Sequence, residues 1–230
     1  MFICSFCFKI GRATFLSVSR VGTIDLARNR LRTVDFQMFH ELSLADTINL
    51  AENNITEIKQ GAFKDIYLAV VNISHNRVET IESGAFVNCN NLTVLDLSYN
   101  QISTIPGGAF DGTTYAHDFR LQFNYLTNMS HVPVTYMSGL AILNVSHNQL
   151  EVIPKKTFPK LYELHTIDFS HNHLNNIAPG CFATLFSLRF LNFSNNHLQS
   201  IFIHFYSHFL LLFVFFLKIN YYMLLIKKKT

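Results

Sequence analysis

Four histidines in the second half of the chain have the residue type and spacing that metal binding or pH sensing requires. They flank three asparagines that recur every 24 residues, and they are His147, His171, His173 and His197. If consecutive units of the chain stack side by side, two or three imidazoles come close enough to share a Zn²⁺ ion or to titrate together. A Ser-His-Asn triplet also occurs at Ser74, so it is typical of a repeated consensus. We therefore expect no metal ion and keep zinc binding or pH sensing as the alternative.

The four cysteines divide into a close pair and two isolated residues. Cys4 and Cys7 form one CxxC motif, which is weak evidence for metal or redox chemistry without a second pair or a following strand and helix. We expect no chemistry there. Cys89 and Cys181 stand where other units have aliphatic or small residues. They lie four units apart, about 20 Å at roughly 5 Å per unit, beyond the reach of a disulfide, so both are expected to fill the core.

Eight asparagines set the period of the chain, with six intervals of 24 residues and one of 23. They are Asn29, Asn53, Asn76, Asn100, Asn124, Asn148, Asn172 and Asn196. Apolar residues stand five and three positions before each asparagine, a spacing of two that predicts a strand with one buried face. Phenylalanine recurs ten positions after the asparagine in most units, with Val134 and Tyr206 as departures. This pattern predicts a stack of phenylalanine rings behind the strands.

Each asparagine has a physical reason to recur. Where the chain leaves a strand, buried backbone groups need partners, and a side-chain amide offers two donors and one acceptor. Stacked units would therefore form an asparagine ladder. Because one unit cannot bury its apolar face alone, only the whole array is a domain.

The repeated frame resembles the leucine-rich repeat family. That resemblance implies an α/β solenoid, a horseshoe of about eight coils with a parallel β-sheet on the concave face and a mostly irregular or short-helical convex side. We expect the array over residues 21–201. Residues 1–20 are a poorly defined segment, either a weak signal peptide or a truncated start, and no cysteine-rich cap is evident at either end.

The tail over residues 202–230 is apolar and aromatic. Its longest wholly apolar run, at 209–217, is shorter than the about 20 residues that a helical membrane span needs. Translated non-coding sequence is the favoured interpretation, and a membrane segment or an irregular last coil remain as alternatives. Lysines close the chain and no lipid-anchor spacer is visible, so membrane attachment is left open.

The predicted concave surface argues against an enzyme. Residues four positions before each asparagine are Asp25, Asn49, Asn72, Asp96, Arg120, Asn144, Asp168 and Asn192. They provide no nucleophile with a neighbouring base, no distinct carboxylate pair and no phosphate loop. Residues 1–200 hold 14 Lys and Arg against 15 Asp and Glu, so a nucleic-acid surface is not expected. We predict a protein partner, no cofactor and no small-molecule substrate.

Six Asn-X-Ser/Thr sequons favour an extracellular or cell-surface, membrane-associated protein over a cytosolic one. They begin at Asn54, Asn72, Asn91, Asn128, Asn144 and Asn192. Three of them, at Asn72, Asn144 and Asn192, fall on the predicted concave strands. Glycans there would obstruct that face and would move recognition to the lateral edges, the convex side or coils without glycans.

Some stretches are more specific than the repeat consensus. Residues 61–100, 110–128 and 158–172, with the words TTYAHDF and LYELHTID, resemble the chaoptin-like leucine-rich repeat proteins of arthropod photoreceptors. The resemblance covers residues 23–201 and implies an extracellular, glycosylated, lipid-anchored protein that mediates homophilic adhesion between photoreceptor membranes. Chaoptin is a much longer array, so the resemblance implies a fragment or a shortened relative. The alternative is a fragment of a Toll-like or other receptor ectodomain that binds a protein ligand.

Overall fold

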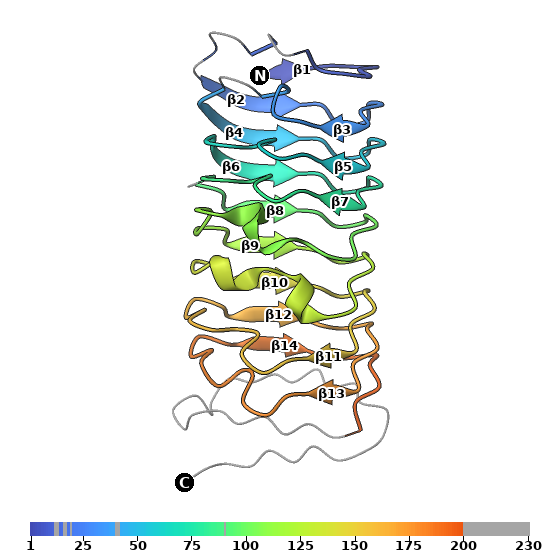
Figure 1. Cartoon of the computed structure of the whole chain (residues 1–230), viewed down its shortest axis with the longest axis vertical. Coiled ribbons are helices and arrows are strands. Elements are labelled where there is room, and N and C mark those ends of the chain that lie inside the picture. Colours follow the sequence, from blue (N-terminus) through green and yellow to red (C-terminus); the bar gives the residue numbers. More distant parts are fainter. Residues whose placement is uncertain (12–13, 16–17, 19, 40–41, 90, 200–230) are drawn as a thin grey trace.

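The computed structural model describes residues 1–11, 14–15, 18, 20–39, 42–89 and 91–199. Over these ranges the chain winds into a solenoid whose coils stack along one long axis (Figure 1). The predicted tail, residues 202–230, lies outside the described residues, and so does Tyr206. The solenoid of parallel coils confirms the predicted fold class.

One parallel nine-stranded sheet takes one strand from every coil. Its strands, in spatial order, are β1 (Phe2–Ile3), β2 (Arg20–Asp25), β4 (Leu44–Asn49), β6 (Tyr67–Asn72), β8 (Val94–Asp96), β9 (Asp118–Arg120), β10 (Ile142–Asn144), β12 (Thr166–Asp168) and β14 (Phe190–Asn192). Each residue pairs with the residue one repeat away, as Leu143 does with Phe119 and Ile167. The interval between successive ladder asparagines therefore equals the sequence separation of paired residues in the sheet.

Shorter strands follow the turn behind this sheet. A three-stranded sheet holds β3 (Thr33–Val34), β5 (Glu57–Ile58) and β7 (Thr80–Ile81), and a two-stranded sheet holds β11 (Val152–Ile153) and β13 (Asn176–Ile177). Three short 3-10 helices occur on the remaining side: η1 (Gly107–Phe110), η2 (Met129–His131) and η3 (Val134–Tyr136). The described ranges hold no α-helix, and none of their helices has the length and hydrophobicity that crossing a membrane requires.

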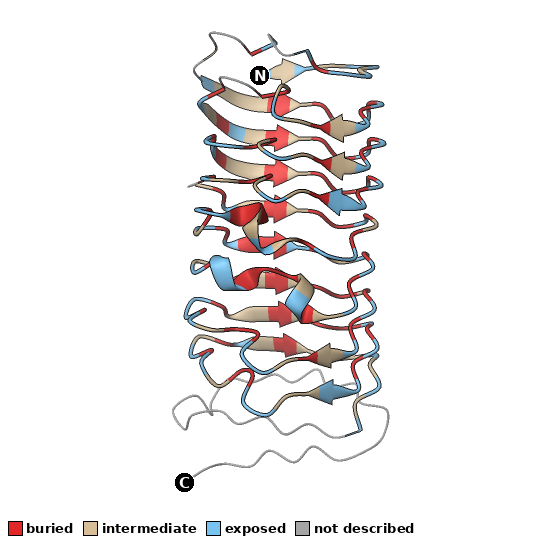
Figure 2. Cartoon of the chain, viewed as in Figure 1, coloured by how far each residue is buried: buried red, intermediate tan, exposed pale blue. Residues whose placement is uncertain are grey.

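The apolar frame fills a core that runs the length of the array. Figure 2 shows buried residues at the same place in successive strands. A phenylalanine stack lies behind them, with ring centroids 4.9 Å apart between Phe63 and Phe86 and 5.1 Å apart between Phe86 and Phe110. The buried Val134 interrupts the stack, which resumes at Phe158 and Phe182. The predicted aromatic stack is therefore confirmed on both sides of its predicted break.

The asparagine ladder is present in all eight repeats. Asn100 is typical: its Nδ2 donates to the Leu97 carbonyl in its own coil at 3.1 Å and to the Ile73 carbonyl in the preceding coil at 3.0 Å. Its Oδ1 accepts the Val78 amide of the preceding coil at 2.9 Å. Seven of the eight amides are buried. Each asparagine therefore closes its own turn and also joins two coils.

The N-terminal residues complete the array at one end, where the sequence indicated no cap. β1 pairs in parallel with β2, and Ile10 and Phe15 are buried against the first coil. Cys4 and Cys7 are joined in a disulfide that cross-links this end of the array. The absence of metal or redox chemistry at the pair stays a prediction, because a structural cross-link does not contradict it. The solenoid extends to residues that the asparagine spacing placed outside it.

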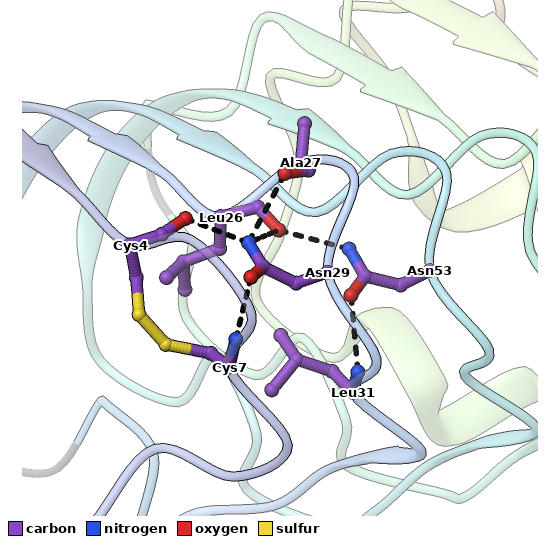
Figure 3. The surroundings of a disulfide bond; sticks show 7 residues. All are labelled: Cys4, Cys7, Leu26, Ala27, Asn29, Leu31 and Asn53. Atoms are coloured by element: carbon purple, nitrogen blue, oxygen red, sulfur yellow. Dashed lines mark hydrogen bonds between the residues drawn. A yellow bond between two sulfur atoms is a disulfide. The ribbon is translucent and has the colours of Figure 1, made fainter.

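The disulfide loop stands where another coil would place its ladder asparagine (Figure 3). Asn29 donates to the Cys4 carbonyl at 2.8 Å, as the next ladder asparagine donates to Leu26 at 2.9 Å. It also accepts the Cys7 amide at 2.6 Å, as the next asparagine accepts Leu31 at 3.0 Å. Two residues separate the cysteines and four separate the two leucines. The cap therefore makes the same turn with a shorter chain and no asparagine.

We expect Asn100→Ala to destabilise the array by about 2 to 4 kcal/mol, because it leaves the buried Val78 amide and Ile73 carbonyl without their side-chain partner. Chemical denaturation of the purified chain measures this loss. Asn175→Ala is the matched control, since Asn175 is exposed and its side chain makes no bond with a described residue. Equal stability of the two variants would show that the ladder does not hold the coils together.

Candidate interaction surface

The concave residues four positions before each ladder asparagine form what we call the inner column. Seven of its eight members accept, through Oδ1, the backbone amide two residues further on; they are Asp25, Asn49, Asn72, Asp96, Asn144, Asp168 and Asn192. Such bonds are Asx turns, which end a strand by offering the backbone a local acceptor. The inner column is thus committed to shaping the turn. Sequence reasoning treated it only as a polar face.

Arg120 is the exception in the inner column and forms the main charge cluster of the concave face. Its guanidinium lies 2.6 Å from the Asp118 carboxylate and 3.6 Å from the Asp96 carboxylate. The hydrogen bond with Asp118 raises the pKa of Arg120. The second Asp118 oxygen is buried and has no hydrogen-bond partner among the described residues. The arrangement neutralises charge on the sheet and provides neither a nucleophile nor a metal ligand set.

The residues directly before the ladder asparagines form a second line, which we call the edge column. They lie in the turn that follows each strand of the nine-stranded sheet. The members of the edge column are Arg28, Glu52, His75, Tyr99, Phe123, His147, His171 and Asn195, and each has a positive φ between 52° and 58°. This left-handed conformation is unusual for residues other than glycine. Because the fold imposes it in every coil, all eight side chains leave the backbone in a common direction.

Five members of the edge column are rings stacked face to face. Centroids are 4.1 Å apart from His75 to Tyr99, 4.2 Å from Tyr99 to Phe123, and 4.1 Å at both of the next two steps, to His147 and then to His171. The last imidazole contacts Asn195 through its Nε2 at 2.8 Å. The N-terminal end of the column holds the Arg28–Glu52 ion pair at 3.1 Å.

The four histidines of the sequence hypothesis lie in two separate pairs. His147 and His171 belong to the edge column, whereas His173 and His197 stack on each other at 5.6 Å. The described residues contain no group of three or more histidine, cysteine or acidic side chains able to hold a metal ion. Sequence reasoning missed the continuity of the rings, although a ring side chain directly before five consecutive ladder asparagines was a visible signal.

A cavity of about 480 Å³ lies at the N-terminal end of the concave face. Small residues at Ala27, Ala51 and Ser74 form its floor between the inner column and the edge column. Its walls include Asp25 and the Arg28–Glu52 pair. The lining is polar and of mixed charge.

The two internal cysteines are confirmed as core residues. Cys89 and Cys181 are both free and buried. Burial raises the pKa of each thiol to about 12. Thiolate is the reactive form, so neither residue is poised for nucleophilic chemistry.

Sequence comparison agrees with this architecture. The family model described as "Leucine rich repeat" matches residues 66–126 and 138–198, which is more than half of the chain. The chain therefore belongs to the leucine-rich repeat family.

Two curated relatives share a short segment with the chain. It is 31% identical over 68 residues to the mouse leucine-rich repeats and immunoglobulin-like domains protein 2, and 30% identical over 70 residues to the human one. These segments cover 30% of this chain but only 6% and 7% of the relatives. The chain spans less than a tenth of the length of the curated relatives it matches.

Solved structures share the fold over most of the chain. A TLR13–ssRNA13 complex matches with a TM-score of 0.73 at 22% identity, covering 84% of this chain and 29% of that one. The glycosylated Toll–Spatzle complex of Drosophila matches with a TM-score of 0.61 at 19% identity, covering 84% of this chain and 36% of that one. At these identities the likeness shows the fold alone.

The stability of the chain should depend on pH through His147. Burial, and then the neighbouring His171, lower its pKa from the usual 6.5, while Asp168 opposes them. The unfolded chain then binds more protons than the folded one, so stability present above pH 6.5 is lost as the pH falls below it.

We expect His147→Phe to show a smaller drop in melting temperature between pH 7.5 and pH 5 than the unaltered chain. Tyr99→Phe, with no change of charge in that range, should keep the full drop; identical drops in all three would contradict the assignment.

Proposed function

We propose that this chain is a non-catalytic segment of an extracellular, membrane-associated protein that mediates adhesion of chaoptin type by binding a second copy of itself on an apposed photoreceptor membrane. The observation that carries the proposal is the edge column, an ordered row of stacked rings along an array whose described residues hold no group of three or more side chains able to bind a metal ion. The resemblance of residues 23–201 to chaoptin-like proteins supports the choice of partner. No cofactor, small molecule or nucleic acid enters the proposed activity.

Charge and glycosylation are consistent with contact between like chains. The repeat body has almost equal numbers of acidic and basic residues, so two copies do not repel strongly at long range. Of the six sequon asparagines, Asn54 is exposed and the other five are half-buried. The Nδ2 groups of Asn72, Asn144 and Asn192 have no hydrogen-bond partner among the described residues, so attaching a glycan there breaks no hydrogen bond of the turn. Glycans there would leave the edge column as the accessible surface.

A receptor ectodomain fragment of the Toll-like kind is the second candidate. Its support is the structural likeness to the TLR13 and Toll complexes, one of which contains the protein Spatzle. A receptor segment would capture a soluble protein ligand and would not bind its own copies. The two candidates therefore differ in a measurable way.

Cell aggregation separates these candidates. The whole chain, fused to a heterologous anchor and displayed on non-adherent cells, should make those cells clump with one another and leave cells displaying an unrelated repeat array outside the clumps. Multivalent display converts a weak pairwise contact into stable adhesion. Single cells at high display density, together with binding of soluble Spatzle-like ligand, would support the receptor instead.

Glycan occupancy gives a second test. We expect the secreted chain to lose mass on enzymatic deglycosylation, and the triple variant Asn72→Asp, Asn144→Asp and Asn192→Asp to lose less. Aspartate keeps the Oδ1 acceptor, as Asp96 and Asp168 already do, so the turns should form normally. An unchanged mass shift in the variant would show that the concave sequons carry no glycan. Asn54→Gln serves as the control for one exposed site.

A further inference from the structure

The three interior rings of the edge column present only their edges. Each ring from Tyr99 to His147 has a neighbour 4.1 to 4.2 Å away on both faces. Sugars and nucleobases bind aromatic residues through open ring faces, and the interior rings of this column have none. The row nevertheless remains accessible, since Tyr99 is 41% exposed and Phe123 37% exposed. A protein surface that meets the row along its length fits this geometry.

The order of the rings is nearly symmetric about Phe123. The apolar ring stands at the centre, Tyr99 and His147 lie one coil away on either side, and His75 and His171 lie two coils away. An apolar centre with a polar rim is the usual anatomy of a protein interface. A two-fold axis through Phe123 would bring each ring against a compatible ring of the same row.

We propose that the edge column from His75 to His171 is the surface through which two copies of this chain bind each other, antiparallel and centred on Phe123. This inference rests on the proposed homophilic function and names its contact. The Phe123 rings of the two copies meet at the axis. The Tyr99 hydroxyl of each copy then reaches the His147 imidazole of the second copy, and His75 reaches His171 of the second copy. Neutral imidazoles have one donor and one acceptor each, so both kinds of pair can form hydrogen bonds.

The charges near the row are compatible with such a pair. None of the five ring residues is a carboxylate or an ammonium group. Arg77 follows His75 by two residues, and in the antiparallel pair it lies toward coil seven, where no carboxylate or ammonium group stands next to the ladder asparagine. Glu52 precedes His75 by one coil and is occupied by Arg28 in its own chain. No charge of one copy is forced against a like charge of the other at neutral pH.

The contact is small, which sets its strength. Five side chains cannot bury the roughly 800 Å² per partner of a standard interface. A single pair of chains therefore binds weakly, and adhesion needs many chains on each membrane.

Bead aggregation with charge-reversed variants tests the contact. The whole chain is coupled to beads in its unaltered form and as Phe123→Asp and Phe123→Lys. Beads of either variant alone should clump at least tenfold more slowly than unaltered beads, because like charges then meet at the axis. A mixture of Asp beads and Lys beads should recover most of the unaltered rate, because opposite charges meet there. Tyr115→Asp, at an exposed ring off the column, should clump normally.

Each outcome decides a separate claim. If unaltered beads stay dispersed, the homophilic function fails and this inference fails with it. If unaltered beads clump and Phe123→Asp beads clump equally, the function stands and the edge column is not its contact. If both variants fail alone and also fail when mixed, Phe123 does not face its own copy and the antiparallel pairing is wrong. Melting temperatures close to that of the unaltered chain confirm that the variants fold.

Discussion

The whole structure depends on how the backbone is satisfied at one turn. Where each strand ends, buried amides and carbonyls face the next coil, and a buried polar group without a partner costs about 1 to 3 kcal/mol. The ladder asparagine meets this demand with a single side chain that bonds its own coil and the preceding one. Local turn formation and coil stacking are therefore one event. This is why the period tolerates so little variation.

The turn gives the inner column and the edge column different structural roles. The inner column ends the strands by accepting backbone amides, so its polarity is mostly used within the chain. The edge column is held in a left-handed conformation and has its side chains free to vary. Arginine, glutamate, rings and asparagine all occupy it in this one molecule. Recognition can change at the edge without disturbing the sheet, whereas the concave centre is less free to change.

The sequence was sufficient for the parts of the fold that repeat. Strand register, the asparagine ladder, the phenylalanine stack with its break at Val134, and the buried Cys89 and Cys181 all follow from position within one frame. The cap was missed because it lacks the asparagine that defines the frame. Its spacing to the first repeat also changes across the disulfide loop, from 22 residues between Cys4 and Leu26 to 24 between Cys7 and Leu31.

The edge column was missed for another reason. Periodicity places a residue in a column, but ring stacking also needs the side-chain direction, and here a backbone angle set by the turn fixes that direction. The histidines were found by residue type and were grouped by proximity in sequence. The structure assigns them by position in the coil, which separates His171 from His173 although only one residue lies between them.

The left-handed residue that every coil shares gives the side chains along the edge of this solenoid a fixed spacing. The backbone sets the distance between successive edge-column positions, so this distance stays the same whichever side chain occupies each position. Duplicating a coil would add one position to the edge column. A substitution would change the side chain at one position and leave the other positions as they are. A protein built in this way can change what it recognises by one side chain at a time and keep the same coil geometry.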